Sequence, residues 1–231
     1  APLALVTGAA QGIGAATTRR LLDDGFRVIA LDRSADGLAQ LAADGADHLV
    51  PCEFDLTAID ASAALLSRLT ETHGPITKLV LNAGVWPGGP IVDMTDEVWD
   101  LNFRVNVTSP FVFLRAMAPV MTAAGGGAIV FVASRNAHRS STNNAAYDAS
   151  KAAVLGLMRT AAGEFAGHRI RVNSVSPGVI STPATPEVEE PGFKAAYLKQ
   201  IPMNRYGTGD DIAAAIAFLL SDDAGFITGQ D

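Results

Sequence analysis

TGAAQGIG, residues 7–14, lies between a short apolar run, Leu3–Thr7, and an Ala-rich segment of helical pattern, Gly12–Asp24. Glycines at such a turn let the backbone bend tightly and approach a pyrophosphate, which then lies at the positive end of the helix. A glycine-rich turn can also be a plain connection, but its position between the first expected strand and the first expected helix favours dinucleotide binding. The cofactor-binding residues predicted at this turn are Gly8, Gln11, Gly12, Ile13 and Gly14.

Short apolar runs alternate along the whole chain with Ala-rich segments of helical pattern. We expect strands at Leu3–Thr7, Arg27–Leu31, His48–Pro51, Lys78–Asn82, Ala128–Ser134 and Ile170–Val175. We expect helices at Gly12–Asp24, Ser34–Ala43, Thr57–His73, Thr95–Ala123, Ala145–Ala166 and Asp210–Asp222. The strands are almost continuously apolar, as a sheet covered on both faces requires, and the regular alternation implies parallel strands. The sequence therefore predicts a single α/β domain over residues 1–231, with a Rossmann-like doubly wound parallel sheet and helices on both faces.

Prolines mark two departures from this alternation. The helical segment 95–123 contains Pro110 and Pro119, so we expect it to be bent or broken there. Segment 177–209 contains several prolines and has little strand character. Because long irregular insertions in compact domains are often lids or binding loops, we predict a substrate lid at 177–209.

The composition argues against several classes of function. The 231 residues include 17 Lys plus Arg and 24 Asp plus Glu, a net charge of −7, whereas nucleic acids and anionic membranes select basic faces. The single cysteine, Cys52, excludes an intrachain disulfide and favours a reducing, cytoplasmic location. The four histidines show no metal-ligand spacing, and no apolar run approaches the roughly 20 residues of a membrane span. We therefore expect no metal site, no nucleic-acid partner and no membrane segment.

A carboxylate ends the second expected strand. Asp32 can accept hydrogen bonds from the adenosine ribose hydroxyls and would repel a 2′-phosphate, which favours NAD over NADP. The guanidinium of Arg33 could instead pair with that phosphate or cover the adenine. A solvated Asp–Arg loop pair is a third interpretation. We predict NAD as the cofactor, with Asp32 and Arg33 in its site.

Tyr147 and Lys151 stand four residues apart in the expected helix 145–166. This spacing puts a phenol and an ammonium on one helix face, one turn apart. A tyrosine has a pKa of about 10 and is a poor base at neutral pH, but a nearby cation favours the phenolate and lowers that pKa. Such a pair also occurs by chance on exposed helices, so it needs support from other residues.

Further residues supply that support. Ser134 closes the fifth expected strand 13 residues before Tyr147, and Asn106 lies in the helical segment 95–123. Together with the turn at 7–14, this set resembles the short-chain dehydrogenase/reductase family, along essentially the whole of Leu3–Gln230. The remaining residues that carry the resemblance are Asn82, Ala83, Gly84, Pro177, Gly178 and Thr182.

The resemblance implies a role for each catalytic residue. Tyr147 would be the general acid/base that exchanges a proton with the alcohol or carbonyl oxygen, and Ser134 would hydrogen-bond the same oxygen. Lys151 would bind the nicotinamide ribose and lower the pKa of Tyr147, while Asn106 would help to hold a water in a proton relay. Two alternatives stay open: Ser134 as an ordinary strand-end cap, and Asn106 as a polar residue bridging a kink near Pro110.

The resemblance also implies the rest of the cofactor site. Asp55 would contact adenine, although it could equally cap the helix expected from Thr57. Thr182 could merely shape its loop. The residues predicted on these grounds to bind cofactor are Asp55, Leu56, Asn82, Ala83, Gly84, Tyr147, Lys151, Pro177, Gly178 and Thr182.

The expected activity is NAD(P)-dependent hydride transfer between a secondary alcohol and a ketone. The polar segment 135–144 would skirt the substrate cleft in the resembled fold, which favours a small polar alcohol, polyol or sugar derivative, although it could also be a solvent-exposed loop. We predict substrate contacts at Asn136, Asn144 and Trp86; Trp86 could equally be buried filler. Alternative functions are an NADPH-dependent reductase of 3-oxoacyl thioesters or other carbonyls, and a non-catalytic dinucleotide sensor. The resemblance further suggests a homotetramer or homodimer.

Overall fold

Six parallel strands form the centre of the fold in this computed structural model, which describes residues 1–43, 48–183, 185 and 190–231. The strand order is β3-β2-β1-β4-β5-β6, so the direction of winding reverses between β1 and β4. Ligands of doubly wound sheets bind outside the carboxyl ends of the strands at such a reversal. The predicted fold class is confirmed. The strands are β1 (Leu3–Thr7), β2 (Arg27–Asp32), β3 (Leu49–Glu53), β4 (Ile76–Leu81), β5 (Gly127–Val132) and β6 (Ile170–Val175).

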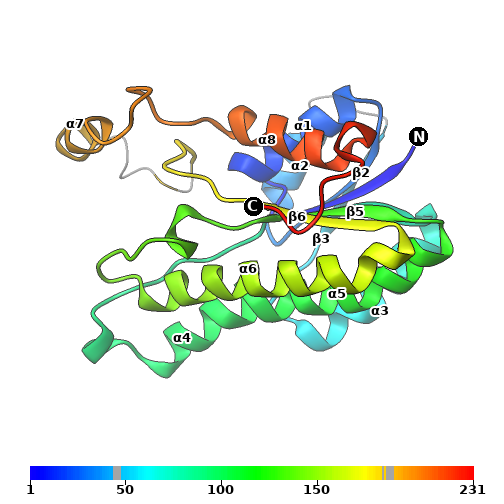
Figure 1. Cartoon of the computed structure of the whole chain (residues 1–231), viewed down its shortest axis with the longest axis horizontal. Helices are drawn as coiled ribbons and strands as arrows, with labels where there is room; N and C mark the ends of the chain where they lie inside the picture. The colour runs from blue at the N-terminus through cyan, green and yellow to red at the C-terminus, as the bar shows by residue number, and fades with distance from the viewer. Residues whose placement is uncertain (44–47, 184, 186–189) are drawn as a thin grey trace.

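Helices cover both faces of the sheet. In Figure 1, α1, α2 and α8 lie above the sheet and α3, α4, α5 and α6 below it, while α7 stands apart at the left of the view. The helices are α1 (Gly12–Asp23), α2 (Ala35–Ala43), α3 (Ile59–His73), α4 (Asp96–Phe103), α5 (Ser109–Ala123), α6 (Ala145–Phe165), α7 (Pro191–Leu198) and α8 (Gly209–Leu220). No helix in these described ranges combines the length and the apolarity that a transmembrane segment needs.

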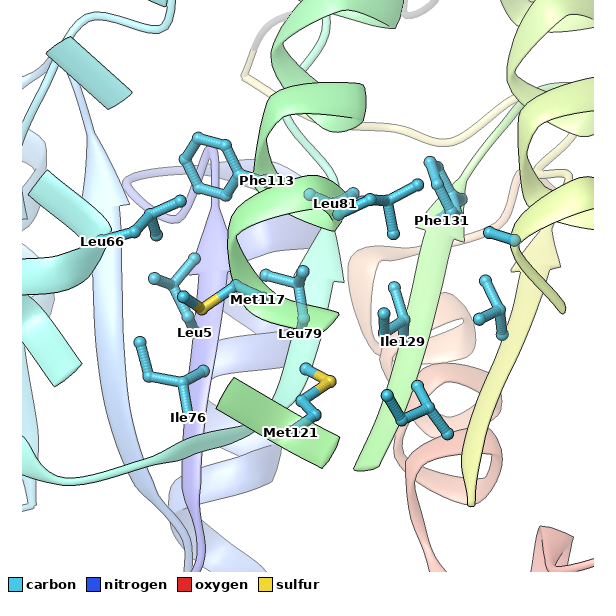
Figure 2. Packing of buried hydrophobic residues seen from close by; sticks show 14 of the residues in the cluster. Leu5, Leu66, Ile76, Leu79, Leu81, Phe113, Met117, Met121, Ile129 and Phe131 are labelled. Carbon is cyan, nitrogen blue, oxygen red and sulfur yellow. The ribbon is translucent and has the colours of Figure 1, made fainter. Parts of the chain in front are cut away.

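Each strand contributes side chains to two hydrophobic cores. In β1, Leu3 and Leu5 pack on the side of α3 and α5, whereas Ala4 and Val6 pack on the side of α1 and α8. This alternation explains why the strands are apolar at consecutive positions. Figure 2 shows the first core, in which α5 lays Phe113, Met117 and Met121 over the strands.

The helical segment expected at 95–123 is interrupted before its first proline. Helix α4 ends at Phe103, a π-helical turn spans Arg104–Thr108, and α5 begins at Ser109 with Pro110 in its first turn. Proline is tolerated in a first turn because the amide hydrogen it lacks would be unpaired there. The segment was expected to be bent or broken at Pro119; a break there is wrong, since α5 continues past Pro119 to Ala123.

Segment 177–209 is less irregular than its prolines suggest. It contains α7, which starts at Pro191, because a proline that would break a helix interior is well suited to its first turn. An isolated bridge between Ile180 and Gly207 joins its two ends. Residues 184 and 186–189 of the predicted lid lie outside the described residues.

Replacing Phe113 by alanine tests the importance of the core below the sheet. Phe113 is fully buried, so Phe113→Ala should lower the free energy of unfolding by about 3–5 kcal/mol. Urea unfolding followed by circular dichroism measures this loss. Phe218→Ala on α8 is the matched control, since its side chain is 46% exposed and should cost about 1 kcal/mol or less. Equal losses in the two variants would contradict this description of the core.

Candidate active site

The glycine-rich turn after β1 is held against the end of β4 by Asn82. The side-chain amide of Asn82 donates hydrogen bonds to the carbonyl oxygens of Thr7 (2.9 Å) and Gly8 (3.1 Å). Gly8 has φ +66°, and a Cβ on Gly14 would overlap the Gly8 carbonyl oxygen. Only glycine fits both positions. The result is a tight backbone cradle at the start of α1, which fits a dinucleotide pyrophosphate.

A cleft with a volume of about 540 Å³ runs along the carboxyl ends of the strands. This size is typical of ligand pockets. Gly14 and Asn106 do not line it. The predicted site residues that do line it are Gly8, Gln11, Gly12, Ile13, Asp32, Arg33, Asp55, Leu56, Asn82, Ala83, Gly84, Trp86, Ser134, Asn136, Asn144, Tyr147, Lys151, Pro177, Gly178 and Thr182.

Asp32 is fixed at the end of β2 by two backbone amides. Its carboxylate accepts hydrogen bonds from the amide of Ala10 in the glycine-rich turn and from the amide of Ser34, both at 3.0 Å. A carboxylate oxygen can accept more than one hydrogen bond, so Asp32 keeps acceptor capacity toward the cleft. The arrangement presents a fixed negative charge beside the pyrophosphate cradle.

Asp55 does not cap helix α3. The helix begins at Ile59 after Ala58, and no side chain caps it. The Asp55 carboxylate instead accepts a hydrogen bond from the Thr57 amide (2.8 Å), within the turn that leads to the helix. Its position in the cleft lining, next to Leu56, leaves the cofactor-contact prediction standing.

Ser134, Tyr147 and Lys151 come together in the cleft from two elements. Ser134 lies just beyond the end of β5 and is hydrogen-bonded to the Tyr147 phenol, while Tyr147 and Lys151 lie on α6. The Lys151 Nζ atom is 5.8 Å from the centre of the Tyr147 ring. A hydroxyl, a phenol and an amine therefore converge on one region of the cleft.

Burial controls the acidity of Tyr147 in this structure. Desolvation is the largest influence and raises the pKa of the phenol, the hydrogen bond from Ser134 lowers it, and the charge of Asp148 raises it. The expectation that Lys151 makes the pKa of Tyr147 low does not hold here. The Lys151 Nζ atom donates a hydrogen bond to the Val132 carbonyl (2.8 Å) and lies beside the Tyr147 ring.

Burial also makes the Lys151 amine easier to deprotonate. The side chain is only 4% exposed, and desolvation lowers the pKa of Lys151 to about 8. Because an unpaired buried ammonium is unfavourable, the charged form is disfavoured relative to water. The amine therefore titrates much closer to neutral pH than an exposed lysine does.

Asn106 lies behind the wall of the cleft, in the π-helical turn. Its side-chain amide accepts a hydrogen bond from the Val85 amide and donates to the Val85 carbonyl and the Ser150 hydroxyl, all at 2.9 Å. Ser150 in turn donates to the Tyr147 carbonyl (2.7 Å). Asn106 thus connects the π-turn, the segment after β4 and helix α6. It bridges elements near the helix interruption, as the structural alternative proposed.

Asp148 holds the polar segment between Ser134 and Tyr147. Its carboxylate accepts hydrogen bonds from the Asn136 side chain (2.8 Å), and from the Ser141 amide (2.8 Å) and hydroxyl. Asn136 and Asn144 line the cleft, whereas residues 138–140 and 142–143 are exposed. The segment is therefore partly cleft wall and partly surface loop. Trp86 lines the cleft with 43% of its surface exposed, so it is not buried filler.

The loop after β6 lies close to both the glycine-rich turn and Ser134. The Arg135 amide donates to the Pro177 carbonyl (3.0 Å). A Cβ on Gly12 would lie 3.3 Å from the Thr182 side chain, which places Thr182 over the turn. Thr182 also shapes its own loop, because its hydroxyl bonds that of Thr185 (3.1 Å).

Several lining residues were missed by the sequence analysis. Most are apolar neighbours of predicted residues, and the apolar strand ends could have indicated them. Tyr197 on α7 gave no signal, because no motif links it to the cleft. Arg135 lies in the polar segment but was not singled out. The missed lining residues are Leu31, Phe54, Thr57, Val85, Leu101, Val105, Val132, Ala133, Arg135, Val179, Ile180, Thr185 and Tyr197.

Over the described part of the chain, no group of three or more His, Cys, Asp or Glu residues is arranged to hold a metal ion. The polar atoms of the cleft come from amides, hydroxyls, one amine, two guanidinium groups and two carboxylates. With the glycine cradle and the Ser134–Tyr147–Lys151 cluster, they fit a dinucleotide and a hydroxyl-bearing substrate.

Comparison with known proteins agrees with this geometry. A family model described as enoyl-(acyl carrier protein) reductase matches residues 8–231. The 3-oxoacyl-[acyl-carrier-protein] reductase FabG of Thermotoga maritima is 38% identical, covering 98% of this chain and 93% of its own. The D-threitol dehydrogenase of Mycolicibacterium smegmatis is 37% identical, covering 99% and 89%.

Solved structures resemble the whole fold. A protein from Beutenbergia cavernae, assigned as an NAD(P)-dependent gluconate 5-dehydrogenase and solved with NADP at low occupancy, superposes with a TM-score of 0.93. It is 32% identical, with 99% of this chain and 93% of that chain covered. Levodione reductase superposes with a TM-score of 0.91 at 30% identity, covering 99% and 94%. The chain therefore belongs to the short-chain dehydrogenase/reductase family, whose members are NAD(P)-dependent oxidoreductases acting on alcohols and ketones.

Proposed function

We propose that this protein oxidises the secondary alcohol of a small polar compound, a polyol or a sugar derivative, with NAD. The observation that carries the proposal is the convergence of Ser134, Tyr147 and Lys151 in a cleft whose other end holds Asp32. The presence of the whole acid/base set argues against a non-catalytic sensor. The same residues serve the reverse reduction, because proton transfer at Tyr147 is reversible.

The proton and the hydride of the alcohol go to two different acceptors. Tyr147, as phenolate, accepts the hydroxyl proton, the electron pair of the C–H bond leaves as hydride, and the carbon–oxygen bond becomes a carbonyl. Bound NAD would supply the hydride acceptor, the C4 position of its nicotinamide ring. Ser134 donates a hydrogen bond to the oxygen on which negative charge develops.

Lys151 binds the nicotinamide ribose and assists Tyr147. One of its donors is used by the Val132 carbonyl, which fixes the amine and leaves two donors for ribose hydroxyls. We propose that Tyr147 and Lys151 titrate as a pair when Tyr147 loses its proton, because a phenolate this close favours the ammonium form of the amine. The pair therefore releases its first proton near the low pKa of Lys151, about 8. The remaining proton then lies either on the phenol or on the amine, and the second arrangement is the phenolate–ammonium form in which Tyr147 can act as a base.

Asn106 positions the wall behind Lys151. A Cβ on Gly84 would lie 3.4 Å from both the Asn106 Oδ1 atom and the Lys151 Nζ atom, so the two side chains flank one glycine. Pro110 has no amide hydrogen and cannot donate the i→i+4 helical hydrogen bond to the Asn106 carbonyl. We propose that a water at this carbonyl carries the proton away from Lys151.

Asp32 supports NAD as the cofactor. A 2′-phosphate at this end of the cleft would meet a carboxylate that two backbone amides hold in place. Arg33 lines the same end and forms no hydrogen bond or ion pair with the described residues. It is therefore available to cover the adenine. The similar structure assigned as gluconate 5-dehydrogenase is described as NAD(P)-dependent and holds NADP at low occupancy, so the cofactor of this chain has to be measured.

A polar substrate is supported by Asn136, Asn144 and Ser134 at the reacting end of the cleft. Two of the similar proteins are named for polyhydroxylated compounds, threitol and gluconate. Sites that hydrogen-bond several hydroxyls discriminate against apolar analogues, because buried polar groups would lose their partners.

A second candidate is an NADPH-dependent reductase of 3-oxoacyl thioesters. The 38% identity to the Thermotoga maritima reductase favours it, whereas Asp32 disfavours the phosphorylated cofactor. Relative rates with thioester and polyol substrates, each with both cofactors, distinguish the two candidates.

We also propose a homotetramer or homodimer in the cytoplasm. Large apolar side chains are partly exposed on α4 and α5, namely Trp99, Leu101 and Phe111, and could pack against a second copy. The cytoplasmic location stays a prediction from the single cysteine, Cys52, which is a free thiol in this structure.

Tyr147→Phe removes the proton-transferring hydroxyl. Turnover should fall by about 10²–10⁴-fold, because this is the usual contribution of a general acid/base, while the dissociation constant of NAD stays within about twofold. Steady-state kinetics and fluorescence titration measure the two quantities. Tyr206→Phe is the matched control, since Tyr206 lies outside the cleft lining. Unchanged turnover in the Tyr147 variant would disprove the assignment.

The pH dependence tests the coupling of Tyr147 to Lys151. For alcohol oxidation, kcat/KM should rise with pH through an apparent pKa near 8, where the pair loses its first proton. In Lys151→Met only the phenol titrates, and burial raises its pKa above the ordinary value, so the rising limb should move to higher pH than in the wild type. Lys151→Arg keeps a cation beside the phenol, and its pH profile is compared with that of Lys151→Met. An identical profile in wild type and the methionine variant would contradict the coupling.

Asp32→Ala should weaken the binding of NAD more than the binding of NADP. The ratio of the two dissociation constants should change by about 10–100-fold, which corresponds to the free energy of a hydrogen bond to a charged group. The ratio is the measured quantity, because loss of the bond from Ala10 could loosen the glycine-rich turn for both cofactors alike. Asp32→Asn keeps an acceptor without the charge, and Asp36→Ala on α2 is the control outside the cleft. Equal weakening of both cofactors would remove the basis for NAD preference.

A further inference from the structure

The charged side chains that line the cleft are divided between its two ends. Asp32 ends β2 and Asp55 follows β3, and the sheet order separates these strands from β5 by β1 and β4. At the other end, beside Ser134 and Tyr147, the described lining residues include the cations Arg135 and Lys151 and no carboxylate. The charge of Asp148 also acts on Tyr147 at this end, but the oxygens of Asp148 accept hydrogen bonds from Asn136 and Ser141.

Arg135 lies at the centre of that end. It follows Ser134 directly, and its amide donates to the Pro177 carbonyl, so its backbone is tied to the loop after β6. Its side chain reaches α7, where the Nη2 atom donates to the Tyr197 hydroxyl (2.7 Å) and the guanidinium carbon lies 5.2 Å from the ring centre. The guanidinium is thus fixed against the helix of the predicted lid.

Most hydrogen-bond donors of the Arg135 guanidinium are unused by the described residues. An arginine side chain has five N–H donors, and one is used, by Tyr197. No carboxylate of the described residues forms an ion pair with it. Asp231 lines a smaller hollow next to Arg135, but its oxygens bind Ser174, Ser176 and His138. A half-buried cation in a pocket, held in place without an anionic partner, is suited to an anionic ligand.

We propose that the substrate carries an oxyanion, a carboxylate or a phosphate, in addition to its secondary alcohol, and that Arg135 binds it. This inference rests on the proposed function and narrows its substrate class. The planar guanidinium fork matches either oxyanion through two parallel hydrogen bonds. Lys151 does not serve instead, because the Val132 carbonyl takes one of its donors and the proposed function assigns the other two to the nicotinamide ribose. Tyr197 fixes the fork, so binding the anion also holds α7 over the cleft.

The test compares each acid with a neutral compound of the same shape. Aldonic acids of four to six carbons are paired with their primary amides, and polyol phosphates with the parent polyols; the two series distinguish carboxylate from phosphate. We expect the wild-type protein with NAD to favour one charged series by about 10–100-fold in kcat/KM, the value of a charged hydrogen bond. Calorimetric titration of the NAD-loaded protein gives the same comparison as dissociation constants, without turnover.

Variants assign the effect to Arg135. Arg135→Met should bring the acid-to-amide ratio of kcat/KM close to one, chiefly by raising KM for the acid. Arg135→Lys keeps the charge without the fork and should give an intermediate ratio. Arg139→Met is the matched control, because it removes a cation four residues away that does not line the cleft.

The possible outcomes separate the two proposals. If alcohols are oxidised but charged and neutral members bind equally, the anion site is wrong and the proposed function stands. The anion site is also wrong if Arg139→Met has the same effect as Arg135→Met, or if Arg135→Met weakens NAD and leaves the acid-to-amide ratio intact. If no alcohol is oxidised, the proposed function fails, and the calorimetric ratio alone decides the anion site.

Discussion

The hydrogen bond between the Lys151 amine and the Val132 carbonyl fixes the chemistry of the cleft. The amine is almost completely buried, and this carbonyl is its only acceptor among the described residues. A buried ammonium with one neutral acceptor is under-compensated, which explains why burial lowers the pKa of Lys151 to about 8. The same bond joins helix α6 to the end of β5 and so helps to hold Tyr147 in place, whereas the low pKa of Lys151 comes from burial.

The carboxyl ends of the parallel strands bring the other groups to this point, mostly through backbone hydrogen bonds. The Ala133 amide donates to the Val175 carbonyl (2.9 Å) and the Arg135 amide to the Pro177 carbonyl (3.0 Å), so pairing continues beyond the ends of β5 and β6. Thr7 performs a similar function between β1 and β4, because its hydroxyl accepts hydrogen bonds from the amides of Asn82 and Ala83. Because of these contacts, the floor of the cleft is an extension of the sheet and is not formed by separate loops.

The sequence predicted the sheet and most helices to within about two residues, because consecutive apolar positions and glycine turns depend on local physics. It could not predict the π-turn at Arg104–Thr108, since the widened turn is held by Asn106 through residues distant in sequence. Helix α7 was missed because Pro191 was taken as a sign of irregularity. The raised pKa of Tyr147 was also beyond prediction, because helical spacing gives the distance to a cation and not the extent of burial.

Asp148 shows why acidity and shape are linked in this site. Its negative charge raises the pKa of the adjacent Tyr147, which by itself opposes phenolate formation. Yet its oxygens also hold Asn136 and Ser141, and Asn136 lines the cleft. An amide in place of the carboxylate would reduce the repulsion but would supply one acceptor oxygen instead of two. The structure therefore combines a less acidic phenol with a fixed cleft wall, and the group that counteracts burial and the Asp148 charge is Ser134, whose hydrogen bond lowers the pKa of Tyr147.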